Sequence, residues 1–216
     1  MSTSAAPSPA PTSELQAVIF DIGNVILRFD FNRAMSKMAG HCDPLSVEIL
    51  ARLEPVKLAY EGGRMTRPEF LAEWRSIFRY TSTDEDFVAA FADIFTENEP
   101  VVALIRQLHG RLPLYLLSNT NDIHIDFIFR QYPVFGLFTD AVYSHVVKAS
   151  KPERAIYEIA ARQFGVTPAE TLFIDDLQAN VESAREAGFR AHHYHHERHG
   201  DLLTELRKFG LPGPRE

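Results

Sequence analysis

The chain is poor in cysteine, with Cys42 as the one such residue among 216. A single thiol forms no internal disulfide and builds no zinc site from several cysteines. Oxidation is therefore expected to contribute nothing to the fold, and a reducing, cytoplasmic compartment is the natural interpretation. Long apolar runs are missing as well, so no segment is expected to cross a membrane.

The sequence also lacks a cluster of basic residues. Its 22 lysines and arginines stand against 29 acidic residues, which gives a net charge of -7. Because nucleic-acid binding needs a clustered basic face, no nucleic-acid partner is predicted. A hydrophobic content of 45% is that of an ordinary globular protein. Residues 1–14 are rich in Ser, Ala and Pro and lack the apolar segment of a secretion signal, so they are predicted to form a flexible tail.

Short apolar runs bounded by turn residues predict the strands of a core. These runs are Ala17 to Phe20, Leu112 to Leu117, Ala141 to Tyr143 and Thr171 to Ile174, with a weaker one at Arg190 to Tyr194. Helical patterns separate the later runs. This alternation predicts an α/β fold, a Rossmann-like, doubly wound parallel sheet with helices on both faces. In such sheets the active crevice lies at the carboxyl ends of the strands.

Two of the helical patterns have a clear end. The first covers Lys151 to Phe164 and is capped by Gly165. Its predicted inward face consists of Ile156, Ile159, Ala160 and Gln163. The second covers Gln178 to Ala187, turns Val181 and Ala184 inward and ends at Gly188.

Residues 31–99 show no convincing strand, and several helix starts predict a helical insertion there. The starts are Asp43-Pro44, Thr66 followed by Glu69, and Thr83 followed by Asp86. An apolar stripe of Phe70, Trp74, Ile77 and Phe78 is predicted to be the core of this insertion. The domain prediction is therefore a core made of residues 15–30 and 100–216, with a helical cap over residues 31–99.

Reactive side chains follow the predicted strands. They are Asp21 after the first strand, Ser118-Asn119-Thr120 after the second, Lys148 and Lys151 beyond the third, and Asp175-Asp176 after the fourth. Carboxylates bind a hard cation such as Mg²⁺, and a carboxylate can attack phosphate once a cation and a lysine neutralise the repulsion. Each signal alone is also typical of a turn or a helix cap. Their joint order is what predicts phosphoryl-group chemistry.

The same segments resemble a known family. "VIFDIGNV", "LLSNTND", "KASKPERAIY" and "LFIDDLQANVESAREAGF" are similar to the four motifs of the haloacid dehalogenase-like hydrolase superfamily, and the resemblance extends from about Gln16 to Tyr194. The helical interval then resembles the cap of that family. The "FDxGNV" form, followed by "DFNR" at Asp30 to Arg33, is similar to a branch that includes a bacterial α-D-glucose-1-phosphate phosphatase.

The resemblance implies a role for each matching residue. Asp21 is the expected nucleophile, which forms an aspartyl-phosphate. Ser118 and the backbone of Asn119 are expected to hold the phosphoryl oxygens, and Lys151, in preference to Lys148, to neutralise nucleophile and phosphate. Mg²⁺ is expected on Asp21, Asp176 and the carbonyl of Gly23, with Asp175 acting through water or as a further ligand. Asn180 is either an orienting residue behind this metal site or a solvent-facing helix residue.

Gly23 departs from the family pattern. Most phosphatases of the family carry at this position a second aspartate, which protonates the leaving group and later activates water. Glycine keeps the carbonyl ligand but loses the proton transfer, a contribution of ~10² to 10⁴-fold in rate. A sugar 1-phosphate suits this change, because an anomeric hydroxyl is more acidic than an ordinary alcohol and leaves with less help.

Two other features stay open. Arg64, in the turn "YEGGRMT", is either a contact to substrate or a solvated turn residue. The histidines of "HHYHHERH", His192 to His199, suggest a transition-metal site. Strand alternation, however, points His192 and His193 to opposite faces, which favours a polar strand end and loop.

The predicted function is a Mg²⁺-dependent phosphomonoesterase that acts on a small phosphorylated metabolite such as a sugar 1-phosphate, with the oligomeric state left open. One alternative is a 2-haloacid dehalogenase, which also uses an aspartate nucleophile but needs no metal. The Asp175-Asp176 pair disfavours it. The other is a catalytically silent binding or regulatory member, suggested by Gly23 and disfavoured by the intact set of Asp21, Ser118, Lys151 and Asp176.

Overall fold

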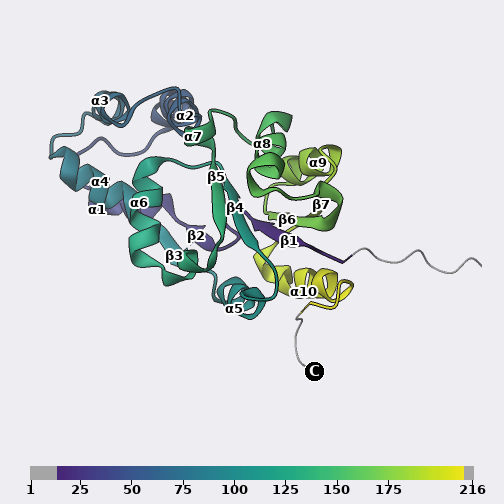
Figure 1. Cartoon of the computed structure of the whole chain (residues 1–216). Helices are drawn as coiled ribbons and strands as arrows, with labels where there is room; N and C mark the ends of the chain where they lie inside the picture. The colour runs from purple at the N-terminus through teal and green to yellow at the C-terminus, as the bar shows by residue number, and fades with distance from the viewer. Residues whose placement is uncertain (1–13, 212–216) are drawn as a thin grey trace, which may run out of the picture.

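The computed structural model describes residues 14–211, and its centre is a five-stranded sheet with the strand order β5-β4-β1-β6-β7 (Figure 1). Every neighbouring pair in this sheet is parallel. The strands are β1 (Ala17–Phe20), β4 (Leu114–Ser118), β5 (Asp140–Tyr143), β6 (Thr171–Asp175) and β7 (Arg190–His193). The predicted α/β fold with a parallel sheet is confirmed. Of the predicted tail over residues 1–14, all but Glu14 lies outside the described residues.

Some helices cover the two faces of this sheet, and others form a separate group beside it. They are α1 (Phe31–Lys37), α2 (Val47–Glu61), α3 (Arg67–Phe78), α4 (Asp84–Ala92), α5 (Glu99–Leu108), α6 (Asp122–Gln131), α7 (Ser144–Val147), α8 (Arg154–Phe164), α9 (Gln178–Glu186) and α10 (His199–Arg207), with the 3-10 turns η1 (Pro133–Leu137), η2 (Pro168–Glu170) and η3 (His196–Arg198). No helix among residues 14–211 is long and apolar enough to span a bilayer.

The residues of β1 explain how the sheet is covered on both faces. Successive strand residues point to opposite faces. Ala17 and Ile19 pack in one cluster with residues of α8 and α9, whereas Val18 and Phe20 pack in another with residues of α5 and α10. All four are fully buried. Figure 1 shows the same division, with α8 and α9 on one side of the sheet and α5 and α10 on the other.

Helix α8 begins later than predicted, at Arg154, and its inward face differs from the prediction. Ile156 and Ala160 are buried as expected, but Gln163 is exposed and donates from Nε2 to Oδ2 of Asp140 at 3.0 Å. Phe164 is buried in its place, because the apolar stripe continues at the spacing 156, 160, 164. The predicted caps are confirmed: Gly165 and Gly188 have φ angles of 65° and 94°.

The segment over residues 31–99 is helical, as predicted, except at its end. There β3 (Phe95–Glu97) pairs antiparallel with β2 (Leu27–Phe29). The prediction of no strand is therefore wrong at this place, since three residues are too few to show a period of two. Strand β2 precedes α1 and strand β3 follows α4, so their pairing brings the two ends of the α1–α4 segment together. The division into a core and a cap at residues 31 and 99 stays a prediction.

The predicted helix starts in this segment were right at two places of three. Thr66 forms a capping box with Glu69, and the Thr83 side chain accepts the N–H of Asp86 at 3.0 Å. The start at Asp43-Pro44 is wrong. Helix α2 begins at Val47, because the side chain of Ser46 accepts the N–H of Ile49 and caps the helix there.

Aromatic side chains fill the space between α3, α4 and α6. The predicted stripe of Phe70, Trp74, Ile77 and Phe78 is buried, each residue being at most 4% exposed. Phe70 packs 5.3 Å from the ring of Phe91 on α4, and Phe91 stacks at 4.5 Å on His124 of α6. The aromatic core of the helical segment therefore continues directly onto a helix that follows β4.

His124 has a hydrogen-bond partner at each of its two ring nitrogens. Its Nε2 lies 3.2 Å from the carbonyl oxygen of Phe91, and its Nδ1 lies 3.1 Å from Nδ2 of Asn121. Asn121 caps α6 by accepting the His124 N–H at Oδ1, so its amide group faces the ring as a donor. A ring that donates from Nε2 and accepts at Nδ1 satisfies both contacts. Burial favours this neutral ring and lowers the pKa of His124 to about 4, against the raising effect of the Phe91 carbonyl.

We expect this histidine to make stability depend on pH. The folded-state pKa of about 4 lies below the ordinary value of 6.5, so the unfolded chain takes up the proton first as pH falls. The free energy of unfolding should fall between pH 6.5 and 4, with a share of ~3 kcal/mol from His124. Urea unfolding across this range measures it. His124→Gln should flatten the curve and the exposed His196→Gln should not. An unchanged slope in His124→Gln would contradict the assignment.

Candidate active site

Three strand ends bring the predicted acidic and hydroxyl residues together. Asp21 follows β1, Ser118 ends β4 and Asp175 ends β6, and these three strands are neighbours in the sheet. The N–H of Asp21 donates to the carbonyl of Ile174 at 2.9 Å, which continues the β1–β6 ladder by one step. Asp21, Ser118 and Asp175 are 7%, 2% and 0% exposed, so these three polar side chains are shielded from water.

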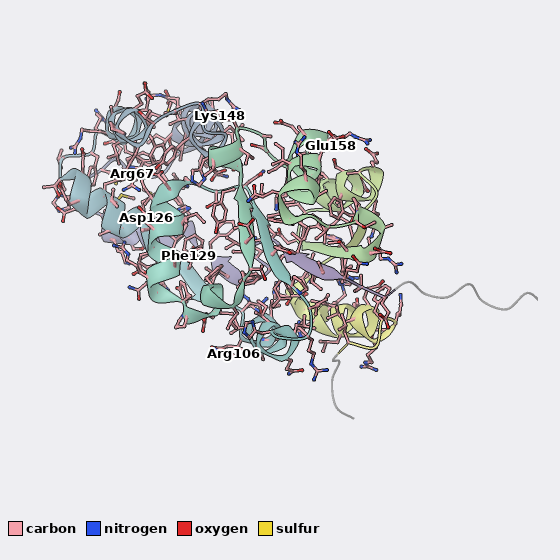
Figure 2. The ribbon with its side chains drawn as sticks, viewed as in Figure 1. Arg67, Arg106, Asp126, Phe129, Lys148 and Glu158 are labelled. Carbon is pink, nitrogen blue, oxygen red and sulfur yellow. The ribbon has the colours of Figure 1, made fainter. Side chains whose placement is uncertain are left out.

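Lys151 is the cation of this site. Its Nζ lies 2.9 Å from Oδ1 of Asp21 and 2.6 Å from Oδ2 of Asp175. Asn119 fixes the backbone there, because its Oδ1 accepts the Lys151 N–H and its Nδ2 donates to the Lys151 carbonyl, both at 2.8 Å. Lys148 is exposed, on the surface near α2 and α7 (Figure 2). The structure therefore brings Lys151, and not Lys148, to the carboxylates.

Asn180 faces inward and holds Asp175. It is 3% exposed, and its Nδ2 donates to both carboxylate oxygens of Asp175 at 3.0 and 3.1 Å. The N–H of Leu177 donates to the same carboxylate at 2.8 Å. With Lys151 on its other side, both oxygens of Asp175 are engaged by protein donors. Asp175 is therefore better arranged to orient its neighbours than to offer a free ligand atom.

Asp176 is half-buried beside Asp21 and is held by a residue that the sequence did not reveal. Asn24 donates from Nδ2 to Oδ2 of Asp176 at 3.1 Å. Asn24 adopts a left-handed backbone, with φ of 52°, a conformation that asparagine tolerates better than most residues. The "GN" pair after Asp21 is a turn signal, but nothing in it points to a carboxylate 152 positions away.

The donor set fits a hard divalent cation. Asp21, Asp175 and Asp176 place ligand atoms within 4.8 Å of one another, and Lys151 is the one cationic side chain in contact with them among residues 14–211. Burial raises the pKa of Asp21 to about 6, against the lowering effect of Lys151, and Asp175 raises it further. The Gly23 carbonyl takes part in no backbone hydrogen bond of the described chain. Asp21, Asp176 and this carbonyl offer oxygens of the kind that Mg²⁺ binds.

The loop after β4 is anchored by α7. The N–H of Thr120 donates to Oγ of Ser144 at 3.0 Å, and Nδ1 of His145 lies 3.0 Å from the Thr120 carbonyl. Ser144 Oγ in turn donates to the carbonyl of Glu61 at 2.5 Å. Ser144 and Glu61 were not found by sequence reasoning, because a lone serine or glutamate carries no signal of a contact that joins distant segments.

Arg64 and the histidines of residues 192–199 add no metal-binding side chain to this cluster. Arg64 is exposed and donates to the Leu58 carbonyl at 2.9 Å, near the end of α2. A contact from Arg64 to substrate stays a prediction. His193 places Nε2 2.8 Å from the Asp176 carbonyl. Among residues 14–211, Asp21, Asp175 and Asp176 make the one group of three or more metal-binding side chains, so the histidines after residue 191 form no such group.

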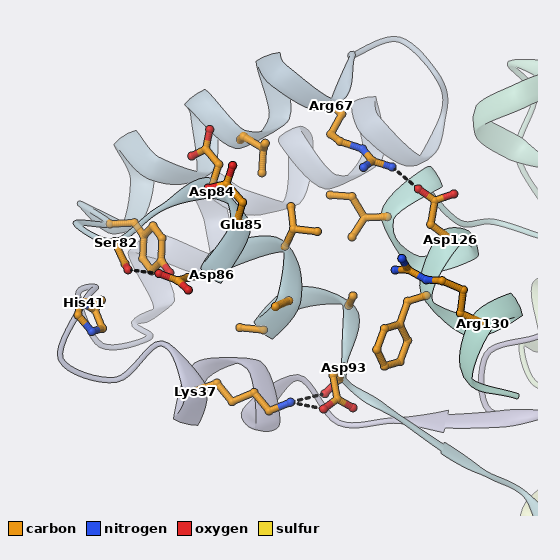
Figure 3. A pocket seen from close by; sticks show the side chains of 18 of the residues that line it. Lys37, His41, Arg67, Ser82, Asp84, Glu85, Asp86, Asp93, Asp126 and Arg130 are labelled. Atoms are coloured by element: carbon orange, nitrogen blue, oxygen red, sulfur yellow. Dashed lines mark hydrogen bonds and ion pairs between the residues drawn. The ribbon is translucent and has the colours of Figure 1, made fainter.

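A groove of about 1160 Å³ lies elsewhere, between α4 and α6 (Figure 3). None of its lining residues belongs to the site described above. Lys37 pairs with Asp93, and Arg67 pairs with Asp126 at 2.7 Å, so these charges already have partners within the protein.

Comparisons with known proteins identify the family. The model of a haloacid dehalogenase-like hydrolase matches residues 15–188. The chain therefore belongs to the haloacid dehalogenase-like hydrolases.

Individual relatives cover most of the chain. A D-ribitol-5-phosphate phosphatase of Bacteroides thetaiotaomicron is 24% identical over 201 residues, which are 89% of this chain and 97% of that protein. A solved structure of a haloacid dehalogenase family enzyme from the same organism has a TM-score of 0.78 at 26% identity and covers 88% of this chain and 98% of its own. Its complex with magnesium and inorganic phosphate has a TM-score of 0.73 at 27% identity, covering 82% and 93%.

Removal of the Lys151 charge should destabilise the protein. Lys151→Met leaves two buried carboxylates without their cation, so we expect a loss of about 3–5 kcal/mol in the free energy of unfolding. Chemical denaturation in the absence of added metal measures it. Lys148→Met is the matched control and should stay within about 0.5 kcal/mol of wild type. Adding Asp21→Asn to Lys151→Met should recover part of the loss; a double mutant no more stable than Lys151→Met would contradict this electrostatic account.

Proposed function

We propose that this haloacid dehalogenase-like hydrolase is a Mg²⁺-dependent phosphomonoesterase that forms an aspartyl-phosphate on Asp21. The contact that carries the proposal is the bridge of Lys151 Nζ to Asp21 and Asp175, at 2.9 and 2.6 Å, beside a third carboxylate. A buried carboxylate next to one lysine and a hard-cation donor set is suited to attack an anionic phosphate. The phosphatase among the relatives, and the solved complex with magnesium and phosphate, support the same activity.

Each side chain then has one task. An Asp21 oxygen attacks phosphorus, and Ser118 with the Asn119 N–H holds the phosphoryl oxygens. Lys151 neutralises the negative charge that nucleophile and phosphate share. Asp21, Asp176 and the Gly23 carbonyl would hold Mg²⁺, which when bound supplies positive charge to the phosphoryl oxygens.

Further side chains support this first group. Asn24 orients Asp176, and Asn180 orients Asp175. The Ser118 hydroxyl lowers the pKa of Asp21 and so opposes the effect of burial. These contacts keep the carboxylates in place before substrate arrives.

The helical segment over residues 31–99 serves as the cap in this proposal, over a core of residues 15–30 and 100–216. The Arg67 guanidinium on α3 pairs with Asp122 and Asp126 on α6 at 2.6 and 2.7 Å. Tyr60 on α2 also donates its hydroxyl to Asp122. Asp122 begins the helix that follows the phosphate-binding loop, so the cap is tied to the segment next to the reacting group.

A small phosphorylated metabolite such as a sugar 1-phosphate is the proposed substrate. Gly23 carries no acid to protonate a leaving group, and an anomeric hydroxyl needs less protonation than an ordinary alcohol. The resemblance of "FDIGNV" and "DFNR" to the branch with an α-D-glucose-1-phosphate phosphatase supports this choice. The ribitol 5-phosphate specificity of the relative from Bacteroides makes a phosphorylated polyol the other ester to test.

We expect phosphate release to require both Asp21 and Mg²⁺. Asp21→Asn should lower kcat/KM by on the order of 10³-fold or more, because an amide cannot form the phosphoenzyme. A panel of phosphomonoesters, assayed with Mg²⁺ and with a chelator, measures it, and the exposed Asp201→Asn is the matched control. Chelator-resistant release of chloride from a 2-chloro acid, without phosphate release, would instead establish a dehalogenase.

Gly23→Asp should raise activity most on esters with poor leaving groups. A Cβ built on Gly23 would lie 3.5 Å from Cε1 of Phe29, an ordinary contact, so a side chain can start there without a clash at its Cβ. The expected gain in kcat/KM on glycerol phosphate is up to ~10²-fold, the low end of general acid catalysis, with a smaller gain on glucose 1-phosphate. Equal wild-type activity on these two esters would remove the basis of the leaving-group explanation.

A further inference from the structure

One histidine of the run His192 to His199 contacts the site at the strand ends. His193 is the last residue of β7, and in the parallel pairing of β6 with β7 it lies opposite Asp175. Its Nε2 lies 2.8 Å from the carbonyl oxygen of Asp176, the next residue along. Because a carbonyl oxygen only accepts hydrogen bonds, Nε2 carries the proton and donates it. No step of the proposed phosphatase reaction uses this contact.

The alternation of side chains along β7 explains why His193, and not His192, makes this contact. Successive residues of a strand point to opposite faces of the sheet. Ala191 packs in the cluster that holds residues of α8 and α9, so His193, two residues on, points to that face as well. Burial lowers the pKa of His192, against the raising effects of Glu205 and Asp201 on α10, which places this ring toward the other face.

His193 holds one end of a single peptide group. The carbonyl of Asp176 and the N–H of Leu177 belong to the same planar unit. His193 donates to the carbonyl, and the Leu177 N–H donates to Oδ1 of Asp175 at 2.8 Å. Asp175 is itself held by Lys151, which lies 2.6 Å from its Oδ2. Both ends of the peptide plane are therefore engaged, and because Cα of Asp176 lies in this plane, the origin of the Asp176 side chain is held as well.

The Asp176 side chain has a further hydrogen bond at its tip. Asn24 donates from Nδ2 to Oδ2 of Asp176 at 3.1 Å. Asp176 places a ligand oxygen within 4.8 Å of those of Asp21 and Asp175. A carboxylate that is held at its backbone and at its tip loses little further freedom when a cation binds, and this raises the affinity for the cation.

We propose that His193 is a positioning residue for Mg²⁺, which holds the backbone of Asp176 so that its carboxylate stays beside that of Asp21. This inference rests on the proposed function, which assigns Mg²⁺ to Asp21, Asp176 and the Gly23 carbonyl. His193 contacts neither substrate nor metal in this proposal and acts through Asp176. Removing a hydrogen-bond partner that orients a metal ligand typically costs ~10- to 100-fold in metal affinity.

The test is a calorimetric titration with Mg²⁺, without substrate, of the wild-type chain and of His193→Phe, which keeps a ring but removes the N–H donor. The Kd for Mg²⁺ should rise by ~10- to 100-fold in His193→Phe. His193→Gln, whose amide again offers an N–H donor, should recover most of the affinity. In a phosphatase assay, His193→Phe should need a correspondingly higher Mg²⁺ concentration for half-maximal activity. Its kcat at saturating Mg²⁺ should stay close to that of wild type, because His193 does not touch the reacting atoms.

A matched control separates this role from a general effect of losing a histidine. His196 is exposed in the turn after β7, so His196→Phe should bind Mg²⁺ as wild type does. Unchanged Mg²⁺ affinity in His193→Phe, with or without a lower midpoint of urea unfolding, would overturn the positioning role. A Kd in His193→Gln as high as that in His193→Phe would overturn it too. If His193→Phe does not fold, His193→Ala should show the same rise in Kd.

The proposed function can fail separately from this inference. Mg²⁺ binding that weakens in His193→Phe, in a chain that releases phosphate from no ester, would support the positioning role and overturn the phosphatase proposal. Chelator-sensitive phosphate release by wild type, together with unchanged Mg²⁺ affinity in His193→Phe, would do the reverse. A wild-type chain that binds no Mg²⁺ would overturn both.

Discussion

The contact of one buried lysine with two buried carboxylates is the constraint on which the rest of the molecule depends. Moving such charges out of water costs several kcal/mol for each ion, and close pairing repays the cost only when the geometry is good. Here the geometry is produced by β1 and β6, which place Asp21 and Asp175 side by side, and by Asn119, which clamps the Lys151 backbone. The parallel sheet is thus the device that makes an otherwise unfavourable cluster of charges possible.

Helix α6 connects this charged site to the helical segment over residues 31–99. This helix starts just after the loop that carries Ser118 and Asn119, and its first turn meets the segment from two directions. Asp122 takes Tyr60 and Arg67 as partners, while His124 packs under Phe91. Helix α6 therefore joins the helical segment to the loop after β4 by side-chain contacts in its first turn.

Much of this arrangement could be predicted from the sequence, because the signals that predict it lie within short stretches of the chain. Apolar runs of four or five residues, each ending in an acid or a hydroxyl, predict parallel strands with a reactive edge, and Asp21, Ser118, Lys151 and Asp175 do meet there. Two predictions of secondary structure and burial were wrong. Strand β3 has only three residues, too few to show the alternation of a strand, and Phe164 is buried on α8 where Gln163 was predicted to be.

The residues that were missed depend on tertiary contact. Asn24 contacts Asp176, and Ser144 joins Thr120 to Glu61, across sequence separations that no local pattern encodes.

The ribbon of β2 and β3 determines where the helical segment is attached. Because Leu27 lies opposite Glu97 and Phe29 opposite Phe95, the two ends of the α1–α4 segment lie side by side. Helices α1–α4 therefore form an insertion whose two ends lie side by side, so a change in its length need not displace Asp21 or Asp175 from the ends of β1 and β6.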